Sequence, residues 1–316
     1  MPQDFQQQFR DATVLITGGA GFIGSHLARR LVELGATVRV IDDLSGGFKD
    51  NLPKQAELRQ ASILDEKSLR EAIGGCRFVF HEAAMVSVPE SVEQPGRCAQ
   101  INIMGTQHVL EAARNAGAQR VIFAASAAAY GGNPKLPSRE DHPTDCNSPY
   151  AASKVAGEVL MSAFGKCYEL STVSLRYFNI FGPRQNPDSP YAAAISAFAK
   201  ALRAGKQPTI YGDGKQTRDF THIDNVIHAN LLAAASSRRF QGEIINIGTG
   251  NRISLLDVLR EMGRVLGVDV KPVFDTPRAG DVRDSIADIS KARELLGYQP
   301  IVDFAAGIER TLNHSS

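Results

Sequence analysis

The stretch VLITGGAGFIGSHL, residues 14–27, decides the fold of this chain. A β-rich run leads into glycines and then into a helical pattern, and Gly19, Gly21 and Gly24 have the G-x-G-x-x-G spacing, with Gly18 extending the run. Glycines permit a tight turn and let the backbone approach a pyrophosphate, while a helix N-terminus offers free N–H groups. The stretch therefore predicts a strand, a dinucleotide-binding turn and a helix.

The rest of the chain repeats this alternation of strands and helices. Apolar residues recur at three- and four-residue steps after the glycines, and Gly35 is placed to end that helix. Six short β-rich runs are ATVLITG, TVRVIDD, FVFHEAA, RVIFAAS, STVSLRYFN and EIINIGTG. We therefore predict an α/β fold, a Rossmann-type doubly wound parallel sheet over 11–178, to which 219–249 returns. Loops rich in Gly, Pro and Asp predict a smaller C-terminal α/β domain over 179–316.

Composition excludes several classes of protein. The 316 residues are 43% hydrophobic, and 35 basic and 34 acidic residues give a formal charge of +1 without a basic stripe, so we expect neither a nucleic-acid nor a membrane partner. Cys76, Cys98, Cys146 and Cys167 lack metal-ligand spacing, so we expect no metal. The N-terminus is polar and no apolar run is long enough to span a bilayer, and we therefore expect a cytoplasmic protein.

An acidic residue ends the second predicted strand, in VRVIDDLS. Asp42 stands where a carboxylate accepts hydrogen bonds from the adenosine ribose of a dinucleotide. Its charge would repel a 2′-phosphate, so NAD is favoured over NADP. Its neighbour Asp43 is the alternative for this role.

A tyrosine and a lysine follow in NSPYAASKVAGE, residues 147–158. Tyr150 and Lys154 are four residues apart, hence on one face of a helix that Ser148 and Pro149 begin. A neighbouring ammonium and a bound nicotinamide cation would both lower the pKa of the phenol from about 10 toward neutrality. The pair predicts proton transfer beside a dinucleotide.

With these motifs the chain resembles the short-chain dehydrogenase/reductase superfamily, in its extended branch of nucleotide-sugar epimerases and dehydratases. The resemblance implies NAD as cofactor and a catalytic Ser or Thr at the end of a strand. Ser126, in FAASAAAYGG, occupies that position, four residues before Tyr130. The implied catalytic residues are Ser126, Tyr150 and Lys154.

The resemblance also implies a cofactor shell and a substrate shell. Asn102 matches a residue that steadies the sheet, whereas Ser62 stands where the family has an adenine-binding aspartate. The predicted cofactor contacts are Gly18, Gly21, Phe22, Ile23, Asp42, Ser62, Ile63, Ala83, Ala84, Tyr150, Lys154 and Tyr177. The predicted contacts of a UDP-sugar substrate are Ser87, Ser126, Asn179, Ala193, Arg218, Arg278, Asp281 and Ser285. Among these, Arg218 and Arg278 would bind the diphosphate and Asp281 the uridine ribose.

The same alignment of motifs predicts the reaction. Dehydratases of this branch carry an Asp-Glu pair where this chain has Ala127 and Ala128, so elimination of water is excluded and C4 epimerisation remains. Epimerases restricted to UDP-glucose and UDP-galactose resemble one another in having a bulky tyrosine where this chain has Ser285. We therefore predict UDP-N-acetylglucosamine and UDP-N-acetylgalactosamine as the preferred pair, with Ser87 and residues 191–193 near the acetyl group, and UDP-glucose and UDP-galactose as a second pair.

Two alternatives stay open, and the resemblance adds an oligomeric state. One is epimerisation of UDP-glucuronate, for which Arg184 is the candidate partner of the C6 carboxylate. The other is a non-catalytic NAD-binding regulatory protein, which would need none of the three catalytic residues. The resemblance also implies a homodimer through helices around 99–116 and 150–168.

Overall fold

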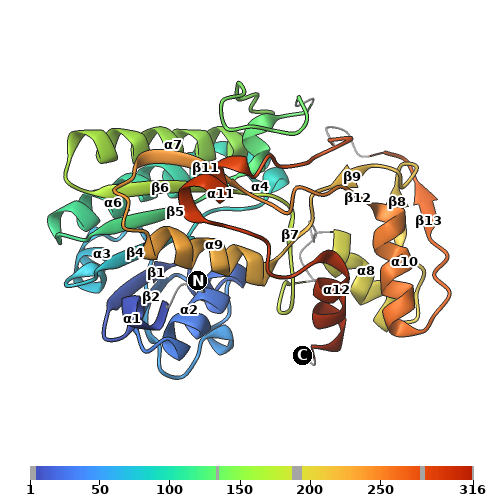
Figure 1. Cartoon of the computed structure of the whole chain (residues 1–316), viewed down its shortest axis with the longest axis horizontal. Coiled ribbons are helices and arrows are strands. Elements are labelled where there is room, and N and C mark those ends of the chain that lie inside the picture. Colours follow the sequence, from blue (N-terminus) through green and yellow to red (C-terminus); the bar gives the residue numbers. More distant parts are fainter. Residues whose placement is uncertain (1–4, 133–134, 187–193, 278–281, 315–316) are drawn as a thin grey trace.

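The computed structural model of the chain describes residues 5–132, 135–186, 194–277 and 282–314. At its centre lies one sheet of seven strands, each parallel to its neighbours (Figure 1). The order across it is β3 (Glu57–Gln60), β2 (Thr37–Asp42), β1 (Thr13–Thr17), β4 (Phe78–His81), β5 (Arg120–Ser126), β6 (Ser171–Tyr177) and β11 (Gln241–Ile247). The order reverses between β1 and β4, and ligands bind outside the carboxyl ends of strands at such a switch point. The predicted doubly wound sheet is confirmed.

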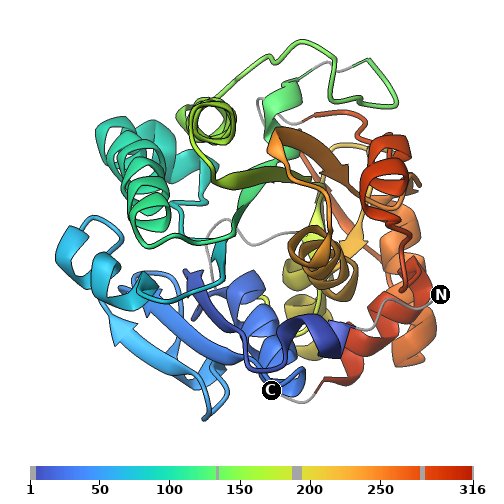
Figure 2. The same ribbon diagram turned by 60° about the vertical axis from the view of Figure 1, so that its left-hand side comes forward.

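Two layers of helices cover the sheet because successive strand residues point to opposite faces. In β1, Val14 and Ile16 enter one buried apolar cluster and Leu15 enters the other. The first face is covered by α1 (Phe5–Phe9), α2 (Phe22–Glu33), α9 (Ile223–Ala235) and α11 (Ser290–Leu296). The second face is covered by α3 (Glu66–Ile73), α6 (Gly105–Asn115) and α7 (Pro149–Cys167). Figure 2 shows these helices on either side of the sheet.

The C-terminal part has an apolar cluster of its own, with Phe181, Phe198 and Met262 among its buried members. It lies beyond one side of the sheet, at the right of Figure 1. Its helices are α8 (Ala194–Arg203), α10 (Leu255–Leu266) and α12 (Phe304–Asn313). Its paired short strands are β7 (Ile180–Phe181) with β10 (Thr221–His222), β8 (Thr209–Tyr211) with β13 (Val273–Asp275), and β9 (Thr217–Arg218) with β12 (Ile253–Ser254). The domain boundaries themselves stay a prediction.

Short helical segments connect these parts, and all but the first of them contribute residues to the cavity at the ends of the strands. They are η1 (Lys49–Asn51), α4 (Val88–Glu93), α5 (Pro95–Ala99), the π-helical η2 (Gln100–Met104) and the 3₁₀ turn η3 (Ala127–Tyr130).

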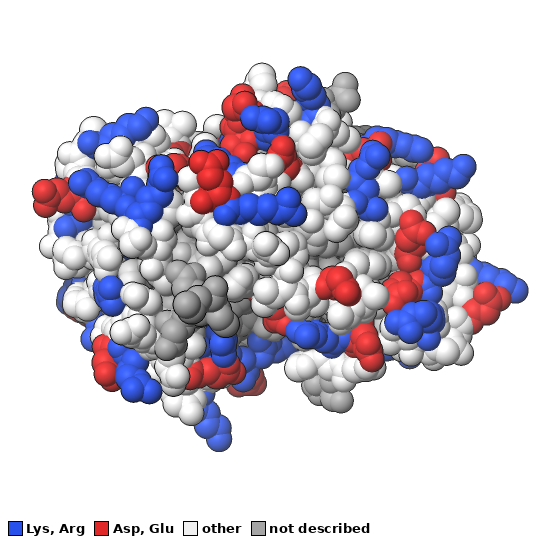
Figure 3. Space-filling model, in the orientation of Figure 1, with Lys and Arg blue, Asp and Glu red and all other residues white. Residues whose placement is uncertain are grey.

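The surface agrees with the balanced composition. On the face shown in Figure 3, basic and acidic side chains are interspersed rather than gathered into a stripe. Within the described ranges, no helix is both long and apolar enough to cross a membrane.

Candidate active site

A cavity of about 1110 Å³ runs along the carboxyl ends of the sheet strands. Every predicted site residue that lies in the described part of the chain lines it. On the cofactor side these are Gly18, Gly21, Phe22, Ile23, Asp42, Ser62, Ile63, Ala83, Ala84, Tyr150, Lys154 and Tyr177. On the substrate side they are Ser87, Ser126, Asn179, Arg218 and Ser285. Ala193, Arg278 and Asp281 lie outside the described residues, as do residues 191 and 192.

The glycine loop is shaped to receive a pyrophosphate. Gly18 has a φ of +67°, and a Cβ there would stand 2.7 Å from the backbone nitrogen of Ala83. A Cβ at Gly24 would overlap the carbonyl oxygen of Gly18. Gly21 caps the N-terminus of α2 without a side chain, so the first N–H groups of the helix face the cavity, where an anion is stabilised. The loop therefore fits the diphosphate of NAD.

Asp42 is held at the end of β2 by two backbone donors. Its Oδ2 accepts a hydrogen bond from the Ala20 N–H at 2.9 Å, and its Oδ1 accepts one from the Leu44 N–H at 2.8 Å. Burial raises the pKa of Asp42, although these two hydrogen bonds oppose the shift. Asp43 also lines the cavity, but it is exposed and its carboxylate accepts from Ser45. The geometry favours Asp42 for the ribose.

Ser126, Tyr150 and Lys154 meet where β5 ends beside the first turns of α7. The Ser126 hydroxyl is hydrogen-bonded to the Tyr150 phenol, and the Lys154 ammonium donates to the Ala124 carbonyl at 2.7 Å. The Lys154 Nζ lies 5.9 Å from the centre of the Tyr150 ring. Burial raises the pKa of Tyr150 and lowers the pKa of Lys154 to about 8. The protein groups around Tyr150 therefore do not by themselves lower the pKa of its phenol, and the predicted fall would need the charge of the bound cofactor.

A hydrogen-bonded support fixes the start of α7. Ser148 caps this helix by accepting from the Ala151 N–H at 3.1 Å. Ser91 accepts from the Tyr150 N–H at 3.1 Å, and Ser153 donates to the Tyr150 carbonyl at 2.7 Å. These contacts hold the Tyr150 backbone from both sides, at a position where Tyr150 lines the cavity.

Asn102, on η2, links α7 to the turn after β4. Its Nδ2 donates to the Ser153 hydroxyl at 2.9 Å and to the Met85 carbonyl at 3.0 Å, and its Oδ1 accepts from the Met85 N–H at 2.8 Å. Met85 follows Ala83 and Ala84, which line the cavity. Asn102 itself does not line the cavity and acts through Met85 and Ser153.

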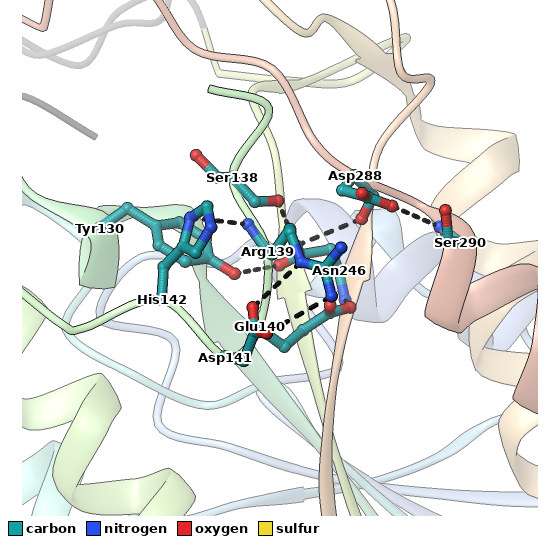
Figure 4. Close-up of polar contacts among 9 residues, drawn as sticks. All are labelled: Tyr130, Ser138, Arg139, Glu140, Asp141, His142, Asn246, Asp288 and Ser290. Carbon is teal, nitrogen blue, oxygen red and sulfur yellow. Dashed lines mark hydrogen bonds and ion pairs between the residues drawn. The ribbon is translucent and has the colours of Figure 1, made fainter. Parts of the chain in front are cut away.

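A polar network fixes the opposite wall (Figure 4). At its centre Asn246, on β11, accepts from the Tyr130 hydroxyl at 2.7 Å and donates to the carbonyls of Ser138 at 2.9 Å and Asp288 at 3.3 Å. The Glu140 carboxylate accepts from the Asn246 N–H at 2.7 Å. One asparagine therefore joins the turn after Ser126 to the segment that follows Ser285.

Backbone pairing sets the substrate end of the cavity. The Ser285 N–H donates to the Thr217 carbonyl at 3.1 Å, which places Ser285 beside Arg218. The Arg218 guanidinium donates to the carbonyls of Thr217 at 2.9 Å and Arg283 at 3.2 Å. Residues far apart in the sequence thus form one wall.

Arg184, the candidate for a sugar carboxylate, is not among the residues that line the cavity. Its backbone has a φ of 64°. Burial, with the nearby Arg29 charge, lowers the pKa of its guanidinium to about 10. The cations on the described walls are Arg97, Lys154 and Arg218.

Several lining residues escaped the sequence analysis. Glu90 and Arg97 stand on the cavity wall, with 3.6 Å between a carboxylate oxygen and Nη1. Glu82, directly after β4, accepts from the Tyr177 hydroxyl at 3.1 Å. A signal for Glu82 was present, because it is the only acidic residue in FVFHEAA and it directly follows a strand whose carboxyl end faces the switch point.

Comparisons with known proteins agree with this geometry. The profile of the NAD dependent epimerase/dehydratase family matches residues 14–248. The chain is 39% identical to a UDP-glucose 4-epimerase of Mycolicibacterium smegmatis, covering 94% of this chain and 96% of that one.

Solved structures give the same result at the level of the fold. A UDP-N-acetylglucosamine 4-epimerase from Methanobrevibacter ruminantium superposes with a TM-score of 0.91 at 37% identity, covering 96% of this chain and 97% of that one. A UDP-glucuronic acid 4-epimerase from Bacillus cereus, in complex with UDP-glucuronic acid and NAD, has a TM-score of 0.87 at 32% identity, covering 95% and 98%.

Proposed function

Because this chain belongs to the NAD-dependent epimerase/dehydratase family, we propose that it interconverts UDP-N-acetylglucosamine and UDP-N-acetylgalactosamine at C4. It is an NAD-dependent UDP-sugar 4-epimerase. The proposal concerns which sugar it prefers and which residues do the work.

The proposed reaction begins with removal of a proton. Tyr150, as the phenolate, takes the proton from the sugar 4-OH while Ser126 holds the hydrogen bond, and C4 loses its hydride as the C4–O bond becomes a carbonyl. Bound NAD supplies a reversible acceptor for that hydride. The 4-keto sugar then presents its other face, C4 regains the hydride, and Tyr150 returns the proton. Lys154 would bind the nicotinamide ribose and supply positive charge.

Ala127 and Ala128 support epimerisation over dehydration. Both line the cavity in the turn that follows Ser126. Eliminating water needs an acid and a base beside the sugar, and a methyl group cannot transfer a proton. The same methyl groups offer a C6 carboxylate no hydrogen-bond donor.

The observation that carries the N-acetyl preference is the small Ser285 side chain on the cavity wall. Serine leaves room for a bulky substituent at C2 of the sugar, whereas a tyrosine at this place would fill that room. The name of the Methanobrevibacter relative agrees with this preference, and the names of the UDP-glucose 4-epimerases are the reason to measure both pairs. UDP-glucuronate gains no support from Arg184, which does not line the cavity.

A comparison of kcat/KM on three substrate pairs tests the preference. We expect the N-acetylated pair to exceed UDP-glucose/UDP-galactose and the glucuronate pair. Ser285→Tyr should lower kcat/KM for the N-acetylated pair by roughly 10- to 200-fold, the range expected when a pocket loses its fit to a substituent, and should spare UDP-glucose. Ser285→Ala keeps the space and is the matched control. Higher kcat/KM for UDP-glucose in the wild type would refute the proposal.

A further inference from the structure

Glu82 is a partly buried acid that the reaction above does not use. It directly follows β4, on the far side of the switch point from the glycine loop and Asp42. A dinucleotide whose adenosine half binds at β1 and β2 would reach across the switch point and place its nicotinamide half toward the ends of β4 and β5. Glu82 lines the same cavity as Ser126 and Lys154, and the Lys154 charge acts on it.

The contacts of Glu82 leave its charge poorly compensated. Its Oε1 accepts one hydrogen bond from the Tyr177 hydroxyl at 3.1 Å, and Tyr177 in turn accepts from Asn230 Nδ2 at 2.9 Å. Its Oε2 is buried and has no hydrogen-bond partner among the described residues. The Lys154 ammonium supplies the positive charge that acts on it. A carboxylate with one buried, unpartnered oxygen and so few other contacts favours any further cation near it.

Burial also makes this acid titratable near neutral pH. Burial raises the pKa of Glu82 to about 7, although the Tyr177 hydrogen bond and the Lys154 charge oppose the shift. Glu82 is therefore mostly neutral below about pH 7 and mostly charged above it.

We propose that Glu82 sets the balance between oxidised and reduced bound cofactor, by placing a titratable negative charge beside the nicotinamide half of the cavity. An oxidised nicotinamide ring is a cation and a reduced ring is neutral. The ionised carboxylate therefore stabilises the oxidised form, and the protonated carboxyl does not.

This arrangement couples the two equilibria in both directions. Oxidised cofactor favours the carboxylate, and reduction favours the carboxyl, which takes its proton from solvent. Hydride transfer to the ring moves the same atoms and electrons whether or not Glu82 is protonated. The linked proton is an additional one, and it binds at Glu82. The inference rests on NAD binding and not on the identity of the sugar, so it is measured without any sugar nucleotide.

A redox titration of the holoenzyme between pH 6 and 8 tests the coupling. Viologen mediators set the potential, and near-ultraviolet absorbance gives the ratio of reduced to oxidised bound nicotinamide. For free NAD this ratio falls about tenfold per pH unit, because hydride uptake consumes one proton. In the wild-type enzyme we expect a further fall of severalfold per pH unit, with about tenfold as the limit for one linked proton. A wild-type slope equal to that of free NAD overturns the proposal without any variant.

Three variants assign the linked proton. Glu82→Gln should show the slope of free NAD, and a wild-type slope in this variant would refute the role of Glu82. Tyr177→Phe removes the hydrogen bond that lowers the pKa of Glu82, so the steep region should move to higher pH. Glu90→Gln is the matched control, since Glu90 also lines the cavity but is paired with Arg97, and it should keep the wild-type slope. Bound nucleotide per chain is measured in every variant, with NAD added to saturation.

Discussion

At the scale of single residues, burial works against the chemistry that Tyr150 is proposed to perform. A phenol must ionise to accept a proton, yet burial raises its pKa, and the hydrogen bond from Ser126 only partly opposes this. Lys154, whose pKa burial lowers to about 8, has its Nζ 5.9 Å from the centre of the Tyr150 ring. The positive charge of oxidised cofactor would lower the pKa of Tyr150 and favour the phenolate. Tyr150 would therefore be a base when the cofactor is in the form that accepts a hydride.

Replacing Tyr150 by phenylalanine tests this role directly. We expect Tyr150→Phe to lower kcat by about 10²- to 10⁴-fold, the usual contribution of a general acid–base group, while bound NAD stays at the wild-type level. Steady-state epimerisation and nucleotide released from the denatured protein give the two readouts. Tyr168→Phe, an exposed position just after the same helix, should keep full turnover. Wild-type turnover in Tyr150→Phe with full NAD would contradict the mechanism.

Residues with a local signature could be predicted, and residues defined by distant partners could not. Motifs a few positions long are enough to identify Gly18 to Gly24, Asp42 and the Tyr150–Lys154 pair. The position of Glu82 directly after a strand is visible in the sequence, but its hydrogen bond comes from Tyr177, 95 positions away, and no local pattern predicts that contact. The charge of Arg184 alone suggests a partner for a carboxylate, whereas the structure does not place Arg184 among the residues that line the cavity.

At the scale of elements, the junction of β1 with α2 depends on how closely the loop packs on itself. Gly24 lies in the first turn of α2, and a Cβ there would overlap the carbonyl oxygen of Gly18. The loop can accept no side chain at this position without moving the N–H groups that face the diphosphate.

Gly24→Ala therefore tests whether this close packing of the glycine loop is needed for NAD binding. We expect NAD affinity to fall by about tenfold or more, because overpacking of this kind costs about 1–3 kcal/mol and displaces the loop. The measurement is NAD bound per chain during dilution, together with the midpoint of urea unfolding. Gly96→Ala in α5, where a Cβ would meet nothing within 4 Å, is the control and should leave both unchanged. Equal NAD retention in the two variants would contradict the expected role of the close contact.

Predicting elements from the sequence succeeded where apolar residues alternate and failed where they do not. The six predicted runs all became strands of the central sheet. The seventh, β3, escaped because it is an edge strand whose residues Glu57, Arg59 and Gln60 are polar and exposed, so no buried face appears in its pattern. Its pairing with β2 is a backbone interaction and leaves little trace in side-chain chemistry.

At the scale of the whole molecule, one face of the larger part carries exposed apolar side chains on neighbouring helices. Met104 on η2 is 50% exposed and Val159 on α7 is 64% exposed. These elements are among those that the family resemblance implies in a dimer interface, and exposed apolar side chains on packed helices are consistent with one. The homodimer stays a prediction.

Introducing a charge on this face tests the dimer. We expect the wild-type protein to have twice the mass of the chain by light scattering, and Val159→Arg to shift it toward the monomer. Val268→Arg is the control, since Val268 is 49% exposed but follows α10 in the C-terminal part. A wild-type monomer, or a dimer that Val159→Arg leaves intact at micromolar concentration, would count against this interface.

The position of β11 in the chain means that β6 is synthesised well before the strand that pairs with it. This strand, residues 241–247, covers the edge of β6, whose seven residues are all buried in the finished sheet. A ribosome makes β6 about 70 residues before it finishes β11, as counted from their positions in the chain. During that interval the nascent chain carries an unpaired edge on a strand that is fully buried in the finished sheet, and such open edges are the kind through which chains aggregate. Pairing of β11 with β6 therefore completes the sheet of the nucleotide-binding half. It also ends the interval in which the nascent chain can aggregate through the open edge of β6.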